Sequence, residues 1–166
     1  MKSYPKKTAN TSDGAKLDIK ARGFWTRGQQ AFFDVRIYNP MAKSYREMEL
    51  IAAHTRNERE KARAYEERII NVDHGSFTPL VFTTSGGMGP RAQVFYKRLA
   101  ELMAERKQKP KSVIVAWMRC RLSFSQLKSA ILCLRGTKSP GPAPTRVADL
   151  DIESTTVDSL IRRKLC

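Results

Sequence analysis

Cysteine, histidine and long apolar runs are all scarce in this chain. Its three cysteines, Cys120, Cys133 and Cys166, form neither a paired framework nor a metal-ligand spacing, which argues against a disulfide scaffold and favours a reducing compartment. The two histidines have no partners at the spacing of a zinc site. No apolar run approaches the ~20 residues that span a bilayer, and the N-terminus lacks the apolar segment of a signal peptide. The sequence therefore predicts an intracellular protein without a membrane partner.

Acidic residues are also few, because 16 Asp and Glu face 31 Lys and Arg, which gives a net charge of +15. A domain this basic is expected to associate with polyanions, and nucleic acid is the commonest of them. The alternative is a merely soluble cationic protein. We expect a nucleic-acid partner and a nuclear location.

The chain is long enough for one ordinary domain, and a hydrophobic content of 41% supplies its core. Residues 1–13 are predicted to form a basic disordered arm and residues 14–135 the folded domain. The Pro-, Ser- and Thr-containing tail at 136–166 is predicted to be flexible, because its proline cluster cannot continue a helix.

Hydrophobic periodicity predicts an α/β domain with a mixed sheet of three or more strands flanked by helices. Strands are expected at 16–22, 30–38 and 77–84, and helices at 45–71, 91–106 and 112–134. The first helix is highly charged, so Glu58 and Glu60 are expected on its solvated face. Its sparse apolar anchors are Leu50, Ile51, Tyr65, Ile69 and Ile70.

Two acidic residues, Asp18 and Asp34, lie inside the apolar stretches that predict the first two strands. A buried carboxylate is costly unless it is paired or binds a metal. Because alternate residues of a strand share a face, Asp18 is expected on the face of Lys20, and Asp34 on the face of Arg36. The same alternation predicts that Leu17, Ile19, Phe33, Val35 and Ile37 lie on the opposite face.

Residues 21–30 contain glycines and polar side chains that suit a hairpin connection. An antiparallel hairpin would bring Asp18 and Asp34 within reach of one divalent ion. Mg²⁺ prefers oxygen ligands, usually one or two carboxylates completed by water. The two acids therefore predict a Mg²⁺ or Mn²⁺ site, and a satisfied pair of structural acids is the alternative.

This arrangement resembles the PD-(D/E)xK, or restriction-endonuclease-like, nuclease superfamily, whose pattern is an acid on one strand and acid-x-Lys on the next. Asp18 matches the first acid, Asp34 the second, and Arg36 the lysine position. The strings at 16–25, 32–36 and 74–82 also look like invertebrate proteins associated with reverse-transcriptase-bearing mobile elements. The resemblance covers residues 13 to 136 and implies a nuclease-like domain that cleaves DNA with a divalent metal, and a homodimer if both strands are cut.

Arg36 departs from the family pattern, since arginine stays protonated and cannot act as a base. Its fork is suited to clamping a phosphate, and it is equally suited to neutralising Asp34. Lys20 is the candidate for the missing ammonium group, because it follows Asp18 on the same face. Without such a replacement, the resemblance implies a protein that binds DNA and does not cut it.

Further residues are candidates for holding nucleic acid. Lys61 and Tyr65 are four apart on one helix face and resemble a Gln-x-x-x-Tyr pattern of exonuclease-like branches, with a solvated charge beside an anchoring tyrosine as the alternative. Arg22, Arg27 and Trp25 of the hairpin are suited to phosphates and to base stacking. The glycine loop at 86–89 is interpreted either as a phosphate cradle or as a tight strand-to-helix turn.

The sequence thus predicts a metal-dependent DNA endonuclease, within a mobile-element protein, with Asp18, Asp34, Arg36 and Lys20 as catalytic residues. The first alternative is a nucleic-acid-binding domain whose cleavage site has decayed. The second is a protein-interaction module of a larger polyprotein.

Overall fold

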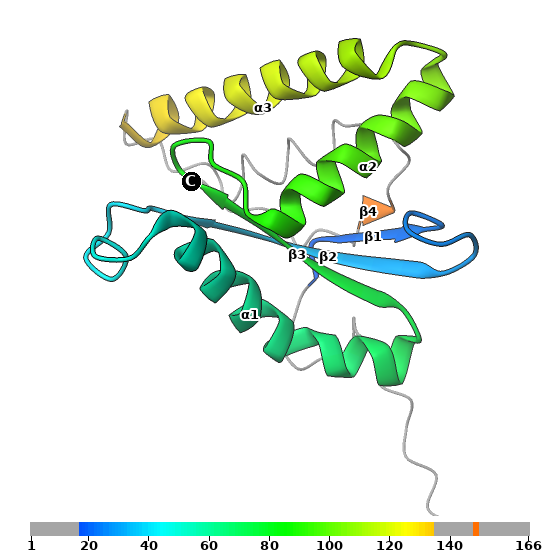
Figure 1. Cartoon of the computed structure of the whole chain (residues 1–166), viewed down its shortest axis with the longest axis horizontal. Coiled ribbons are helices and arrows are strands. Elements are labelled where there is room, and N and C mark those ends of the chain that lie inside the picture. The colour runs from blue at the N-terminus through cyan, green and yellow to red at the C-terminus, as the bar shows by residue number, and fades with distance from the viewer. Residues whose placement is uncertain (1–16, 135–147, 150–166) are drawn as a thin grey trace, which may run out of the picture.

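The computed structural model describes residues 17–134 and 148–149, and these form a layered α/β fold (Figure 1). The predicted arm at 1–13 lies outside the described residues. So does the predicted tail at 136–166, apart from Ala148–Asp149.

The sheet has the strand order β3-β2-β1-β4. Strand β1 (Ile19–Arg22) pairs antiparallel with β2 (Gln30–Tyr38), and β2 pairs parallel with β3 (Ser76–Thr83). The short strand β4 (Ala148–Asp149) pairs parallel with β1. The predicted mixed sheet and the predicted hairpin are both confirmed.

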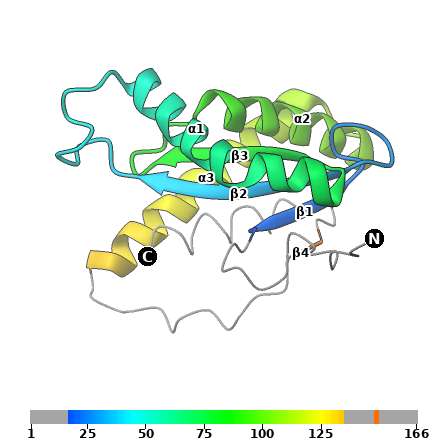
Figure 2. The same cartoon turned by 90° about the horizontal axis from the view of Figure 1, so that it is seen from below.

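Helices cover both faces of the sheet (Figures 1 and 2). Helix α1 (Leu50–Arg68), continued by the π-helical turn η1 (Ile69–Asp73), lies on one face. Helix α2 (Pro90–Lys107) lies on the other, with α3 (Lys111–Leu134) packed on its outer side. Within the described part of the chain, no helix combines the length and the apolar character needed to cross a membrane.

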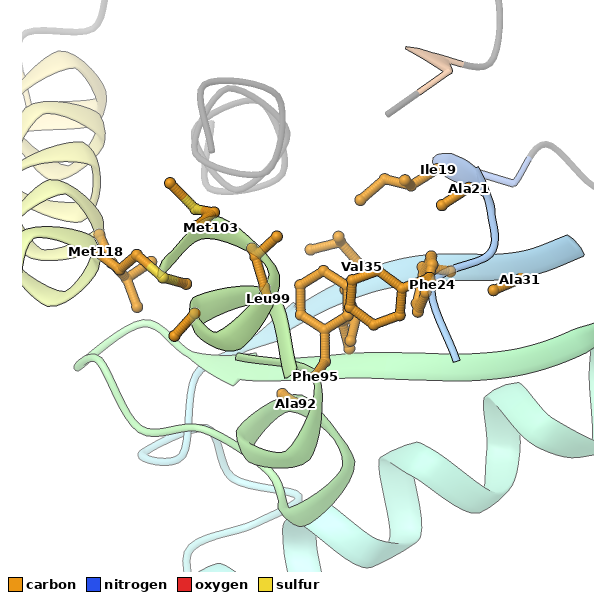
Figure 3. Packing of buried hydrophobic residues seen from close by; sticks show 14 of the residues in the cluster. Ile19, Ala21, Phe24, Ala31, Val35, Ala92, Phe95, Leu99, Met103 and Met118 are labelled. Atoms are coloured by element: carbon orange, nitrogen blue, oxygen red, sulfur yellow. The ribbon is translucent and has the colours of Figure 1, made fainter. Parts of the chain in front are cut away.

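The largest hydrophobic cluster fills the space between the sheet and α2 (Figure 3). Phe33 and Val35 of β2 face it, as the alternation predicts, and they are 0% and 1% exposed. The Phe24 ring of the hairpin connection stacks on the Phe95 ring of α2, with ring centroids 4.9 Å apart and an interplanar angle of 18°. Met118 brings α3 into the same cluster, so one core holds both helices and the sheet together.

The opposite face of the sheet packs against α1 and η1 through smaller clusters. Phe32 lies with Phe77, Ile69 and Leu17. Leu17 and Ile19 therefore occupy different clusters, and the prediction that they share a face is wrong. The reason is that β1 begins only at Ile19, so the strict alternation of a strand does not extend back to Leu17.

The segment after β3 folds back along that strand before α2 begins. The Gly89 N–H donates to the Val81 carbonyl at 2.8 Å, and the Thr83 N–H donates to the Gly87 carbonyl at 2.9 Å. Further back in β3, Pro79 pairs in register with Asp34. These backbone bonds place the start of α2 beside α1, which lies under the same strand.

Candidate active site between helix α1 and the sheet

The face of α1 that packs on the sheet carries mostly polar residues. His54, Asn57, Glu58 and Lys61 follow the spacing i, i+3, i+4, i+7, so they project from one side of the helix. The first three are buried, at 3%, 0% and 6% exposed. The prediction that Glu58 is solvated is therefore wrong.

Three of the predicted apolar anchors of this helix also lie elsewhere. Leu50, Ile51 and Ile70 are 49%, 64% and 51% exposed, whereas Ile69 is buried as expected. The helix is oriented by polar contacts in the middle of its length more than by these residues. Its predicted start at 45 is also too early, because residues 39–49 form turns and α1 begins at Leu50.

The Asp34 carboxylate on β2 is 1% exposed and faces α1. The Lys61 ammonium group reaches it from α1, with Nζ 2.6 Å from Oδ2. The Lys61 side chain is 21% exposed, so the ion pair is closed on the aspartate side and reaches solvent on the lysine side. The same Nζ lies 5.4 Å from the centre of the Tyr65 ring. The Lys61–Tyr65 pair therefore belongs to the surroundings of Asp34.

The β1–β2 register brings the two strand acids to the same place in the hairpin. Ile19 pairs with Phe33 in the antiparallel register. The next positions outward, Asp18 before Ile19 and Asp34 after Phe33, are therefore neighbours across the two segments. The Asp18 carboxylate accepts a hydrogen bond from the Val35 N–H at 2.8 Å. Through this hydrogen bond, Asp18 extends the contact with β2 by one residue before the start of β1.

The two other predicted catalytic cations have different partners. Arg36 Nη1 lies 2.9 Å from the Glu60 carboxylate of α1, and Arg56 contacts the other Glu60 oxygen at 3.3 Å. The Lys20 ammonium group lies over the Phe32 ring, 5.5 Å from its centre. Of the predicted cations, Lys61 is the one that the structure places in direct contact with Asp34. The four-residue spacing of Lys61 and Tyr65 singled out Lys61 in the sequence. It did not indicate that Asp34 is the partner of Lys61.

The hairpin candidates for nucleic-acid contact divide into exposed and packed residues. Arg22 and Arg27 are exposed. Trp25 is partly buried, its Nε1–H donates to Thr78 Oγ1 at 3.2 Å, and its ring packs edge-on against Phe24 with ring centroids 4.8 Å apart. Arg22 and Arg27 therefore present their charge to solvent, whereas Trp25 contributes to packing.

Glu58 links α1 to the start of α2. Its Oε1 accepts a hydrogen bond from the Arg91 N–H at 2.9 Å. A carboxylate at this position complements the positive end of the α2 dipole. Burial raises the pKa of Glu58 above its ordinary value, while the bond from the Arg91 amide and the Arg91 charge oppose the rise.

The glycine loop between β3 and α2 is a structural turn, and the phosphate-cradle interpretation is not supported. Its amide groups are bonded to β3 or to Glu58 within the protein, and backbone N–H groups must converge on a phosphate to bind it. The donors are Gly86, Gly87, Gly89 and Arg91.

His54 provides a test of this buried polar layer. It packs against the Tyr38 ring with centroids 5.5 Å apart, and burial lowers its pKa below the ordinary value of 6.5. Below about pH 6.5 the unfolded chain therefore binds more protons than the folded one. The free energy of unfolding has its full value above about pH 6.5 and falls as the pH drops from there toward the lowered pKa of His54. We expect acidification from about pH 7.5 to about pH 5.5 to lower the Tm of the unmodified protein about 2 to 4 °C more than that of His54→Gln.

The measurement is thermal unfolding of both proteins across this range. Glu58 lies beside Gly89 of the glycine loop, as His54 does. The raised pKa of Glu58 acts in the opposite direction, because it lowers the free energy of unfolding as the pH rises above 4.5, the ordinary pKa of this group. The comparison is therefore between the two pH slopes. Identical slopes would show that His54 is not the group that titrates.

The donor chemistry at the hairpin fits a hard divalent cation. Carboxylate oxygens are the ligands that Mg²⁺ and Mn²⁺ prefer, and Asp18 and Asp34 supply them. Over residues 17–134 and 148–149, no group of three or more His, Cys, Asp or Glu side chains could hold a metal ion. Any metal at this place would therefore depend on these two acids and on water.

Comparisons of the chain with protein-family models, with curated proteins and with solved structures found no match.

Proposed function

We propose that this protein is a metal-dependent nuclease that hydrolyses phosphodiester bonds of DNA, with its site between α1 and the β1–β2 hairpin. The observation that carries the proposal is the contact between Lys61 Nζ and the Asp34 carboxylate at 2.6 Å. The nuclease pattern places an ammonium group beside the second acid, and Arg36 differs from it because a guanidinium stays protonated and cannot act as a base. Lys61 supplies that group from the helix in place of the strand.

The topology supports the restriction-endonuclease-like assignment of the fold. Asp34 lies on β2 and Asp18 directly before β1 of an antiparallel pair, and the chain then passes through α1 into β3, which is parallel to β2. Helices cover both faces of this mixed sheet, as the resemblance implies.

In this proposal each residue has a separate task. Asp18 and Asp34 would hold Mg²⁺ or Mn²⁺, and the chemistry that such an ion would supply is polarisation of the phosphate and a lower pKa of a water molecule. Lys61 offsets negative charge that develops on the phosphate oxygens, and Arg36 contacts a neighbouring phosphate through its fork. Since Arg36 is held by Glu60, substrate would have to compete with that ion pair.

Cleavage of supercoiled plasmid in Mg²⁺ or Mn²⁺ tests the proposal. The purified protein is expected to nick or linearise the plasmid, and Asp34→Ala is expected to lose at least about 100-fold in rate because the metal loses one of two carboxylates. Asp34→Asn, which keeps the shape of the side chain, serves as a second variant, and circular dichroism verifies that both are folded.

Glu67→Ala is the matched control, because Glu67 is an exposed acid on α1. It should cut at the unmodified rate. Equal cutting by a folded Asp34→Asn protein would contradict the site assignment.

A second function, nucleic-acid binding without cleavage, is favoured by one observation. Asp34 is 1% exposed and its carboxylate is held by Lys61, which are the features of a satisfied structural pair. In that case the unmodified protein would bind DNA with an affinity that falls as salt rises, and no metal would produce cutting.

A further inference from the structure

Helix α3 carries a strip of alternating rings and cations on its outer surface. Trp117, Arg121, Phe124 and Lys128 follow one another at spacings of three or four residues. At 3.6 residues per turn these four positions fall within an arc of about 60° on the helix. We call them, together with Lys107 of α2, the α3 strip.

Trp117 organises the first part of the α3 strip. Lys107 Nζ and Arg121 Cζ each lie 5.0 Å from the centre of its ring. Cation–π contacts of this kind hold the two long side chains in place at the surface. The surface around Trp117 therefore carries two ordered cations, Lys107 of α2 and Arg121 of α3.

Phe124 is the exposed ring of the α3 strip. It is 71% exposed, and it lies one turn after Arg121 and one turn before Lys128. An exposed apolar area made by more than one neighbouring side chain, here set between cations, marks an interaction surface. Leu127, which is 57% exposed, extends the apolar area beside the ring.

The charge of α3 selects the kind of partner. The 24 residues of the helix contain Lys111, Arg119, Arg121 and Lys128 and no acidic residue. Lys111 is paired with Glu101 of α2 at 2.6 Å. Phosphate groups complement such a surface. A second copy of this chain would bring the same cations together, so the strip is poorly suited to self-association.

We infer that the α3 strip binds single-stranded nucleic acid, with a base stacked on Phe124 and phosphates held by Lys107 and Lys128. Alternating rings and cations are how proteins bind single strands without reading sequence. A duplex keeps its bases stacked inside and offers no ring face to Phe124. An anionic membrane fits less well, because Arg121 and Lys128 share the arc of Phe124 and would be carried into the lipid with it.

This inference rests on the proposed association with nucleic acid, but not on cleavage. The α3 strip belongs to the layer of α2 and α3, whereas Asp34 faces α1 on the other side of the sheet (Figures 1 and 2). The two surfaces therefore hold nucleic acid at separate places. A strand bound to α3 would tether the substrate without entering the candidate active site.

Fluorescence anisotropy of labelled oligothymidylate, titrated with the full chain, tests the inference. Phe124→Ala is expected to weaken binding about tenfold, in line with the loss of one stacked base, and Phe124→Tyr to restore it. Because Phe124 is exposed, its truncation should leave the Tm unchanged. Val94→Ala, at a 57% exposed position of α2, is the control and should bind as the unmodified protein does.

Unlabelled duplex and phosphatidylserine vesicles are used as competitors. Oligothymidylate should compete better than duplex, and the vesicles should not compete. Equal affinity of Phe124→Ala and the unmodified protein, preference for duplex, or displacement by vesicles through Phe124 would each overturn the inference.

Plasmid cleavage separates this inference from the proposed nuclease. Absent cleavage together with oligothymidylate binding that depends on Phe124 would overturn the nuclease and leave the α3 strip assigned. If the protein cleaves plasmid but Phe124→Ala binds oligothymidylate as the unmodified protein does, the α3 strip inference is overturned and the proposed nuclease is retained.

Discussion

Lys61→Met is expected to destabilise the protein by about 3 kcal/mol, because it leaves the Asp34 carboxylate buried without its counter-ion. Methionine keeps the apolar stem of the side chain and removes only the ammonium group. Removing one partner of a buried pair costs more than replacing both, since the remaining charge has lost its compensation. Urea denaturation gives the free energy of unfolding directly.

A double-mutant cycle with Asp34→Asn isolates the ion pair. In the Asp34→Asn background the same lysine substitution should cost less than about 1 kcal/mol, because no buried charge is left behind. Arg63→Met, at an exposed position of α1, is the control for loss of a cation from this helix. Equal costs of Lys61→Met in both backgrounds would show that the contact with Asp34 contributes nothing to stability.

Phe95→Ala is expected to cost about 3 to 5 kcal/mol, the range for truncating a buried phenylalanine. Phe95 is 0% exposed, and its ring lies 4.9 Å from the Phe24 ring and 4.8 Å from the Phe33 ring, measured between centroids. It therefore joins the hairpin connection, β2 and α2. The cavity would weaken all three contacts at once, and a cost of this size is a large part of the stability of a single domain.

Thermal unfolding of Phe95→Ala beside Val94→Ala measures this effect. The two positions are adjacent on α2, but Val94 is 57% exposed, so its truncation should change the Tm little. Phe95→Leu, which refills part of the cavity, should recover part of the loss. A Phe95→Ala protein as stable as Val94→Ala would contradict the position of Phe95 in the core.

Local patterns predicted the strands of this fold well. The alternation of apolar and charged residues around Asp34 gave the face of Phe33, Val35 and Ile37, because a strand has a period of two. Glycines and polar residues between two such runs gave the hairpin and, through it, the position of Asp18 beside Val35 of β2.

The inner face of α1 could not be predicted in the same way. A helix dense in charge is expected to bury its few apolar residues, yet here His54, Asn57 and Glu58 face the sheet while Leu50 and Ile51 face solvent. The cause is tertiary: Asp34 and the start of α2 are far away in sequence, and they provide the partners that make burial of Lys61 and Glu58 acceptable. No local pattern on α1 contains that information.

Strand β3 ends the sheet, and its outer edge is protected against strand addition. Backbone groups of alternate residues point to the same edge, so Pro79 points the way of Val81 and Thr83, both of which are bonded to the 87–89 loop. Pro79 has no amide hydrogen to offer. An open edge is a template for aggregation and for sheet-to-sheet dimers. At Val81 and Thr83 the edge is already bonded to the chain itself, and at Pro79 it lacks a donor, so this part of the β3 edge is a poor template for strand addition.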